Sequence, residues 1–360
     1  MVTLIPGFGI GPELTEYVRH VFRCGGIPVD FEEIKFSEKD DSEDTWKNAI
    51  LSTKRNGVCL KGNIDHHKKS TEKGISKNVL MRNELDLYVN VIEFKSYPGV
   101  LCNHKDVDMV IIRMNTEGEY NMLEHESIKG VIESLRIITR KNSERVAQFC
   151  FEYARKYGRK KVTTIHNSLI TYVADGLFLT TAQNVSMNYP DIEFNEMDVK
   201  DCCRHLMTNP KEFDVLLMPN LYGNIISHIA CGLIRGVGLV SGKNFGDSAA
   251  VFEVGARHAG WNLAGKNIAN PCSILNAAVD MLEYLGLYFH AYIIHMAIEK
   301  TINEDKIHTQ DIGGTATSIE VIENIMKHVH KLVENINWPY PGLEELQRMV
   351  NHQERQLLIF

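Results

Sequence analysis

Three glycines near the start of the chain have a spacing that invites a nucleotide-binding interpretation. Gly7, Gly9 and Gly11 follow an apolar segment at 2–5, so the sequence predicts a buried strand that enters a glycine-rich turn. Dinucleotide-binding turns have the spacing G-x-G-x-x-G, with an acidic residue about twenty positions further on. Here the spacing is G-x-G-x-G, and no such acidic partner is evident. We therefore interpret the segment as a tight turn in which glycine allows positive φ angles.

The side chains that most often bind metals or form disulfides are scattered. Eight cysteines, at positions 24, 59, 102, 150, 202, 203, 231 and 272, form no C-x-x-C pair, which is typical of reduced core cysteines. Two pairs of histidines are close in sequence, His66 with His67 and His328 with His330. Neither pair has a third ligand nearby in sequence, whereas zinc sites usually take four, so we expect no structural metal there.

The overall composition limits the classes of function. The chain has 360 residues, 44% of them hydrophobic and 24% charged, which is ordinary for a globular protein of about two domains. Its formal net charge of -7 disfavours nucleic acid as a partner, because binding nucleic acid requires a basic face. No apolar run approaches the ~18 residues of a membrane span, so we expect no membrane partner, and no targeting peptide is visible in this sequence.

Short apolar segments alternate with amphipathic helices along the chain. We predict strands at 2–5, 58–60, 88–92, 107–113, 161–166 and 214–218, and helices at 12–22, 142–157, 175–186, 224–235, 271–285, 287–301 and 317–333. In the helix at 142–157, Ser143 is the expected N-cap. The alternation favours an α/β fold with a largely parallel central sheet. Residues 337–360 form a C-terminal extension with one short helical segment.

Five short segments together point to a known family. They are IPGFGIGP at 5–12, NTEGEY at 115–120, MPNLYG at 218–223, KNIANP at 266–271 and DIGG at 311–314. In this order and spacing they resemble the β-decarboxylating dehydrogenases, which include isocitrate and isopropylmalate dehydrogenases. The segments LEHES at 123–127, KS at 95–96 and PGV at 98–100 are similar to regulatory subunits, of gamma and beta type, of the mitochondrial NAD-dependent isocitrate dehydrogenase. The resemblance covers residues 1 to about 335.

The resemblance implies an α/β fold of the isocitrate/isopropylmalate dehydrogenase type. Residues 1–99 and 241–336 would form a large discontinuous domain, and residues 100–240 a smaller domain with dimer-interface elements. The family's active site lies in the cleft between the domains and includes residues of a partner subunit. The resemblance also implies NAD and Mg²⁺ or Mn²⁺ in the complex, a catalytic isocitrate dehydrogenase subunit as partner in a hetero-oligomer, and a location in the mitochondrial matrix.

The family's carboxylate-binding residues are largely present. Ser76, Asn78 and Arg82 match its substrate motif S-x-N-x-x-x-R, and Arg113 matches its next arginine. Arginine suits this role because its planar guanidinium can hold a carboxylate through two hydrogen bonds. Tyr120 matches the family's acid. Taken alone, Arg82 would more often be a solvated helix charge and Tyr120 a packed aromatic residue, but the ordered motif favours anion binding.

The groups that would perform the family's chemistry are missing. Oxidative decarboxylation of a 2-hydroxy acid needs a base for the hydroxyl proton and a divalent ion to polarise the oxygen. The family's lysine base corresponds to Asn167, a neutral amide that is not a usable base. Its metal-binding aspartates correspond to Asn224 and His228 and, from the neighbouring subunit, to Lys200, unless the adjacent Asp201 takes that position. The chain's own metal site is therefore predicted to be lost.

At other positions of the family's cleft, this chain either has a different residue or keeps one that matches the family. Ile92 replaces a substrate arginine, and Leu169 replaces an asparagine that contacts the nicotinamide. For a nucleotide, the resemblance assigns Asn267, Asn270, Asp311 and Arg257, although Arg257 can equally be a surface residue.

Taken together, these substitutions predict a subunit that binds its ligand without turning it over. The prediction is a non-catalytic regulatory subunit that binds citrate or isocitrate and, as a second ligand, ADP. Two alternatives remain open. One is a catalytic NAD-dependent 2-hydroxy acid decarboxylase in which His228 serves as ligand or base. The other is a purely structural partner that binds no small molecule.

Overall fold

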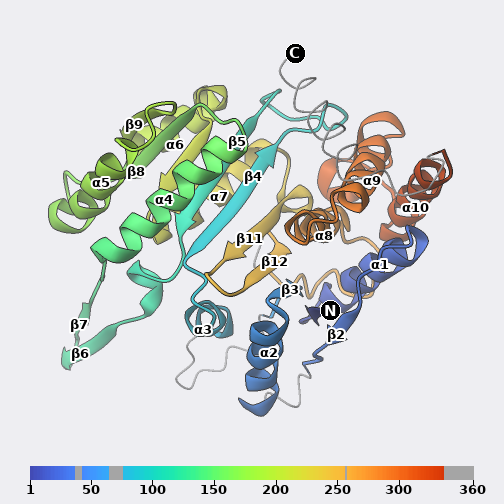
Figure 1. The fold of residues 1–360 in the computed structure, drawn as a ribbon, viewed down its shortest axis with the longest axis horizontal. Helices are drawn as coiled ribbons and strands as arrows, with labels where there is room; N and C mark the ends of the chain where they lie inside the picture. Colours follow the sequence, from blue (N-terminus) through green and yellow to red (C-terminus); the bar gives the residue numbers. More distant parts are fainter. Residues whose placement is uncertain (37–42, 65–75, 256–257, 336–360) are drawn as a thin grey trace.

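The computed structural model describes residues 1–36, 43–64, 76–255 and 258–335, which build an α/β architecture on one large sheet (Figure 1). The sheet has ten strands in the order β2-β1-β3-β12-β11-β4-β5-β10-β8-β9. The strands are β1 Val2–Ile5, β2 Phe31–Glu33, β3 Val58–Lys61, β4 Val89–Lys95, β5 Asp108–Met114, β8 Lys161–His166, β9 Glu193–Asp198, β10 Val215–Met218, β11 Ser241–Phe245 and β12 Ala250–Val254. The α/β class expected from the sequence is confirmed.

The direction of the strands changes at the centre of the sheet. Six neighbouring pairs are parallel, which agrees with the largely parallel sheet that we predicted. The three pairs β12–β11, β11–β4 and β4–β5 are antiparallel, and the sequence did not predict them. The central antiparallel strands thus connect two groups of parallel strands. One group, β1, β2, β3 and β12, comes from the two ends of the chain, and the other, β5, β8, β9 and β10, comes from its middle.

Helices cover both faces of the sheet. They are α1 Gly11–Cys24, α2 Glu43–Asn56, α3 Lys77–Glu84, α4 Arg140–Lys156, α5 Tyr172–Ser186, α6 Val199–Thr208, α7 Asn220–Leu233, α8 Cys272–Tyr284, α9 Tyr288–Glu299 and α10 Ser318–Asn335. Successive strand residues point to opposite faces of the sheet, so neighbouring apolar residues of one strand pack in different hydrophobic cores. On β4, Val91 packs in a core with α4 and α5, whereas Ile92 packs in a core with α6 and α7. In Figure 1, α4 lies in front of the sheet and α7 behind it.

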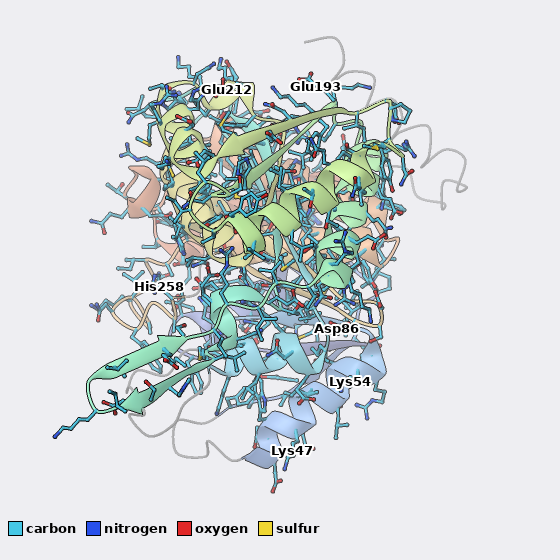
Figure 2. All side chains as sticks on the ribbon, turned by 90° about the vertical axis from the view of Figure 1, so that its left-hand side faces the viewer. Lys47, Lys54, Asp86, Glu193, Glu212 and His258 are labelled. Carbon is cyan, nitrogen blue, oxygen red and sulfur yellow. The ribbon has the colours of Figure 1, made fainter. Side chains whose placement is uncertain are left out.

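Two smaller features complete the description. Strands β6 Glu124–Ile128 and β7 Val131–Ser134 form a separate hairpin that extends away from the body of the molecule in two perpendicular views (Figures 1 and 2). None of the helices in the described ranges is both long and apolar enough to cross a membrane.

One predicted helix start was wrong. The N-cap of α4 is Thr139, whose hydroxyl accepts a hydrogen bond from the Asn142 amide at 3.2 Å. Ser143, which we expected in this role, lies inside the first turn and donates its hydroxyl to the Thr139 carbonyl at 2.8 Å. Both residue types are good N-caps, so composition alone did not decide between them. The domain boundaries remain a prediction, and His66, His67 and the extension at 337–360 lie outside the described residues.

Candidate anion-binding site

A row of polar side chains crosses the centre of the sheet on one face. We call this set the polar row, and it consists of Lys61 on β3, Glu253 on β12, Asn244 on β11, Asn90 on β4 and Arg113 on β5. The strand register places Lys61 opposite Glu253, Asn244 opposite Asn90, and Asn90 opposite Arg113. Each of the five is at most 8% exposed. Charged groups are rarely buried unless they are paired, so their partners define what the row can do.

At one end of the polar row, a lysine and a glutamate form an ion pair. Lys61 Nζ lies 2.6 Å from Glu253 Oε2, and it also donates to the Gly62 carbonyl at 3.1 Å and to Asn78 Oδ1 at 3.2 Å. Burial disfavours the charged carboxylate, but the nearby Lys61 and Arg82 outweigh burial and lower the pKa of Glu253 to about 2. Glu253 is therefore ionised at neutral pH.

Amide side chains join this ion pair to the other end of the polar row. Asn244 Nδ2 donates to Glu253 Oε1 at 2.8 Å. Its Oδ1 accepts from Asn90 Nδ2 at 3.0 Å and from Asn115 Nδ2 at 3.1 Å. Arg113 Nη2 in turn donates to Asn115 Oδ1 at 3.3 Å. Neutral amides thus link the two ends of the polar row without adding charge.

At the other end of the polar row, the predicted ligand-binding residues Arg113 and Tyr120 both contact Asn224, which occupies a predicted metal position. Arg113 Nη1 donates to Asn224 Oδ1 at 2.9 Å, and Asn224 Nδ2 donates to the Tyr120 hydroxyl at 2.6 Å. Tyr120 lies in a short 3₁₀ helix at Gly118–Asn121, and Asn224 lies on α7. A narrow pocket opens beside them, and its lining includes Ile92, Arg113, Asn224, His228 and Glu253.

Helix α3 supplies the remaining predicted residues. Ser76 occupies the N-cap position, and Asn78 and Arg82 are buried on the helix. Asn78 accepts a hydrogen bond from Lys61, and the charge of Arg82 acts on Glu253. Asn78, Arg113 and Tyr120 thus belong to one hydrogen-bonded network, and the charge of Arg82 acts on Glu253 within it. The role of these residues in ligand binding remains a prediction. Three cations (Lys61, Arg82 and Arg113) are thus buried in this part of the molecule, and one of them, Lys61, pairs with the carboxylate of Glu253.

The predicted metal positions do not offer the donors that Mg²⁺ or Mn²⁺ prefers. Asn224 supplies an amide that already contacts Arg113 and Tyr120, and one turn later His228 supplies an imidazole, 6.4 Å from the ring of His258. Both ions prefer carboxylate oxygens. Over the ranges that the structure describes, no three His, Cys, Asp or Glu side chains are grouped so that they could hold a metal ion. The residues present therefore do not fit the ion that the family implies.

The position expected from a neighbouring subunit lies away from this network. Lys200 stands at the start of α6 with a 70% exposed side chain, and its Nζ is 3.7 Å from Asp198 Oδ1. The adjacent Asp201 pairs with Arg204 at 3.0 Å. In the apolar core, Ile92 is buried where the family has an arginine.

The position of the family's base begins an exposed apolar segment. The backbone amide of Asn167 donates to Asp175 Oδ2 at 2.6 Å, and Asp175 is fully buried between Arg136, at 2.6 Å, and the Tyr222 hydroxyl, at 3.0 Å. This network fixes the backbone of the segment. The apolar side chains that follow, Leu169, Ile170, Tyr172 and Val173, are 75–81% exposed.

Two of the predicted nucleotide-binding residues are neighbours. Asn270 Nδ2 donates to Asp311 Oδ2 at 3.0 Å. Asn267 instead accepts a hydrogen bond from the Ile319 amide at 3.0 Å, at the start of α10. Arg257 lies outside the described residues. The role of these residues in nucleotide binding remains a prediction.

The glycine-rich turn is confirmed as a tight turn. Gly7 and Gly9 have φ angles of 74° and 62°, which favour glycine. The Phe8 amide donates to the Asn63 carbonyl at 2.7 Å, and the Ile10 amide donates to the Ala259 carbonyl at 2.9 Å. Because these amides already have carbonyl partners, they do not form a phosphate-binding cradle.

The fold and the site together define a dehydrogenase class. The model of the family "Isocitrate/isopropylmalate dehydrogenase" matches residues 1–327, and the chain belongs to this family. It is 48% identical over 328 residues to the mitochondrial isocitrate dehydrogenase [NAD] subunit gamma of Macaca fascicularis, covering 91% of this chain and 92% of the relative. It is 45% identical over 333 residues to the subunit beta of the same species, covering 91% and 86%.

Solved structures agree with this assignment. The crystal structure of isocitrate dehydrogenase from Methylococcus capsulatus superposes with a TM-score of 0.85 at 34% sequence identity, covering 91% of this chain and 99% of that one. The predicted family, its fold and the similarity to gamma and beta subunits are therefore confirmed.

Sequence reasoning missed two of the three charged residues of the polar row. Lys61 and Glu253 were not among the predicted site residues, and neither were Asn90 and Asn244. One signal was present, because Lys61 ends the apolar run VCLK and Glu253 interrupts the run AVFEV. A charge inside a buried strand indicates either a partner or a function.

Proposed function

We propose that this chain is a non-catalytic regulatory subunit of an NAD-dependent isocitrate dehydrogenase, which binds citrate or isocitrate where a catalytic subunit has its active site. The observation that carries the proposal is the charge of the site. The cations Lys61, Arg82 and Arg113 are buried here, while Asn167 stands at the predicted base position and Asn224 and His228 at two predicted metal positions. Buried guanidinium groups are typical of sites that hold carboxylates.

The residues of the proposed site have two kinds of role in binding the ligand. Arg82 and Arg113 hold carboxylates through their guanidinium groups, and Ser76, Asn78 and Tyr120 add neutral hydrogen-bonding groups. Asn167 cannot take the hydroxyl proton, and Asn224 with His228 cannot hold the divalent ion that would stabilise an enolate. A bound hydroxy acid therefore stays unchanged. ADP is the proposed second ligand, at Asn267, Asn270, Asp311 and Arg257.

Exposed apolar surface supports the partnership with a catalytic subunit. All residues of the β6–β7 hairpin are exposed, Ile128 and Ile132 among them, and the hairpin projects from the body (Figure 2). Leu169–Val173 adds a second exposed apolar segment. Concentrated exposed apolar residues mark interaction surfaces. Since the gamma and beta relatives are named as mitochondrial subunits, we propose a hetero-oligomer in the mitochondrial matrix.

The test is co-expression with a catalytic isocitrate dehydrogenase subunit, followed by assays with isocitrate, NAD and Mg²⁺ in the presence and absence of citrate and ADP. We expect no turnover by the chain alone, and a complex whose activity responds to citrate or ADP. The response should be lost with Arg82→Ala and kept with Lys54→Ala, a matched change on the exposed face of α2. Turnover by the chain alone would refute the non-catalytic role, and a complex indifferent to both ligands would refute the regulatory one.

A further inference from the structure

One buried amide of the polar row has an acceptor that the network leaves unused. Asn90 is 3% exposed, and its Oδ1 has no hydrogen-bond partner within the residues that the structure describes. We propose that Asn90 is a specificity-determining residue, whose Oδ1 accepts a hydrogen bond from the hydroxyl group of the bound hydroxy acid. This inference rests on the proposed function of the site as a binder of citrate or isocitrate.

The hydrogen bonds of the polar row fix which way the Asn90 amide is turned. The ionised Glu253 carboxylate can only accept, so the atom of Asn244 that faces it at 2.8 Å is the Nδ2 donor. Asn244 therefore presents its Oδ1 to Asn90, whose Nδ2 donates to it at 3.0 Å. A second contact of the Asn90 Nδ2, to the Lys243 carbonyl at 3.4 Å, agrees with this orientation. Since both hydrogen atoms of the Asn90 amide are directed to β11, only Oδ1 remains for another group.

The pocket beside Arg113 and Asn224 is where such a group can lie, because Asn90 is part of its lining. The volume of this pocket is about 20 Å³, which is room for one group of the size of a water molecule. A carboxylate is larger, and it is repelled by the negative charge of Glu253, which lines the same pocket. A neutral hydroxyl group fits both the size and the charge of the pocket.

The proposed ligands carry the group that matches this acceptor. In ionised citrate or isocitrate the carboxylates only accept hydrogen bonds, and the hydroxyl is the single donor. The carboxylates therefore have nothing to donate to Asn90 Oδ1, whereas the hydroxyl has. A buried acceptor without a partner is unfavourable, so a site with such an acceptor discriminates against a ligand that lacks the donor.

The experiment compares citrate with tricarballylate, which has the same carboxylates but no hydroxyl group. Calorimetry measures the affinity of the full chain for both compounds. We expect the wild type to bind citrate about tenfold more tightly than tricarballylate. In Asn90→Ala, the affinity for citrate should fall by about tenfold and that for tricarballylate by less than about threefold, so the preference is lost. Asn195→Ala, on the edge strand β9, serves as the control and should keep the preference.

The ratio of the two affinities is the readout, because a general weakening of the site affects both compounds alike. If the wild type binds citrate and tricarballylate equally well, the site does not recognise the hydroxyl group, and the inference is wrong. If Asn90→Ala keeps the wild-type preference for citrate, a group other than Asn90 binds the hydroxyl, and the inference is again wrong. Asn90→Ala removes donors of a buried network and can fail to fold, but the wild-type comparison needs no variant.

The same measurements separate this inference from the proposed function. Equal binding of both compounds by the wild type would leave the proposed tricarboxylate site intact and would refute only the role of Asn90. If the wild type binds neither compound, the proposed ligand is wrong, and the inference fails with it. A preference for citrate that Asn90→Ala abolishes and Asn195→Ala keeps would support both.

Discussion

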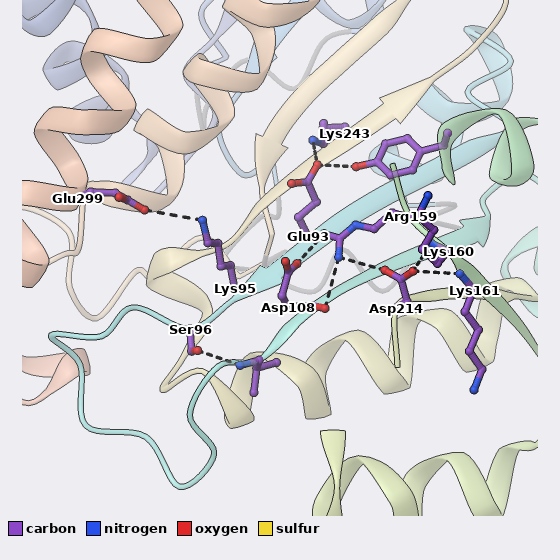
Figure 3. Close-up of polar contacts among 12 residues, drawn as sticks. Glu93, Lys95, Ser96, Asp108, Arg159, Lys160, Lys161, Asp214, Lys243 and Glu299 are labelled. Carbon is purple, nitrogen blue, oxygen red and sulfur yellow. Dashed lines mark hydrogen bonds and ion pairs between the residues drawn. The ribbon is translucent and has the colours of Figure 1, made fainter. Parts of the chain in front are cut away.

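The two faces of the central strands carry polar networks with opposite balances of charge. The polar row lies on one face. On the other face lies a network that we call the back cluster, formed by Glu93, Lys243, Asp280 and Tyr153. Figure 3 shows the contact between Glu93 and Lys243. Lys243 and Asn244 are consecutive on β11, so their side chains point to opposite faces and belong to different networks.

In the back cluster, one ammonium group is shared by two carboxylates. Lys243 pairs with Glu93 and, at 3.0 Å, with Asp280 on α8, and the Tyr153 hydroxyl on α4 donates to Glu93 at 2.6 Å. Burial raises the pKa of Asp280; Lys243 opposes this effect, and Glu93 adds to it. The cluster thus ties two helices to the central strands, with two carboxylates around one ammonium group. The polar row instead keeps an excess of cations beside a pocket. The comparison teaches that the two faces have opposite charge: carboxylates outnumber cations in the back cluster and cations outnumber carboxylates in the polar row, so the polar row is the face that suits the proposed anion.

The largest expected effect comes from breaking the back cluster. Lys243→Met leaves Asp280 and Glu93 without their ammonium partner, so the free energy of unfolding should fall by about 3 kcal/mol. Urea denaturation measures this change. Lys95→Met, on the same strand β4 as Glu93 but with a 54% exposed side chain, should cost less than about 1 kcal/mol. If Lys243→Met instead left stability unchanged and altered citrate affinity, the division between the two networks would be wrong.

The next effect concerns Arg82 on α3, whose charge acts on Glu253 of the polar row. Arg82→Ala should weaken citrate binding by about 2 kcal/mol or more, because a carboxylate of the ligand then loses its guanidinium partner. Arg82→Lys keeps the charge but not the planar fork, and should give an intermediate affinity. Calorimetry measures both. Stability without ligand should change less than in Lys243→Met. If Arg82→Ala binds citrate with wild-type affinity, Arg82 is not part of the ligand-binding site.

Lowering the pH should reveal how much the ion pair of Lys61 and Glu253 contributes to the free energy of unfolding. Glu253 has a folded-state pKa of about 2 and an ordinary value of 4.5, so the unfolded chain binds this proton first. The stability that Glu253 contributes is present above pH 4.5 and is lost as the pH falls towards 2. Urea titrations between these limits should show a dependence on pH that is shallower in Glu253→Gln, by at most about 1.4 kcal/mol per pH unit. Equal dependence on pH in the wild type and in Glu253→Gln would mean that the folded protein does not stabilise the ionised form of Glu253.

The smallest effect concerns the metal. Mg²⁺ alone should leave the melting temperature of the wild-type chain unchanged at constant ionic strength, because Asn224 and His228 are poor ligands for it. The variant Asn224→Asp/His228→Asp should gain a small Mg²⁺-dependent shift, since binding to the folded state stabilises it. A shift of the same size in the wild type would indicate a metal site that the described residues do not reveal.

The sequence predicted the fold better than the detail of the site, for physical reasons. Strands that are mostly apolar, such as Val2–Ile5 and Val215–Met218, were recognised because burial on both faces leaves a simple pattern. Strands β11 and β12 were missed because they place Lys243, Asn244 and Glu253 inside the sheet. These residues are polar for reasons that only the neighbouring strands reveal.

The same limit applies to the candidate site. Arg82, Arg113 and Tyr120 were predicted because they belong to short motifs in the sequence. The pairing of Lys61 with Glu253 joins residues far apart in the chain and depends on the register of β3 with β12. No local pattern specifies that register, so the charge balance of the site required the structure.

The central claim is that the cationic excess of the polar row binds a polycarboxylate without a metal. Calorimetric titration of the wild-type chain with citrate in EDTA tests it most directly. We predict saturable binding in EDTA, with an affinity that falls as salt concentration rises. Binding that disappears in EDTA and returns only with Mg²⁺ or Mn²⁺ would contradict the account.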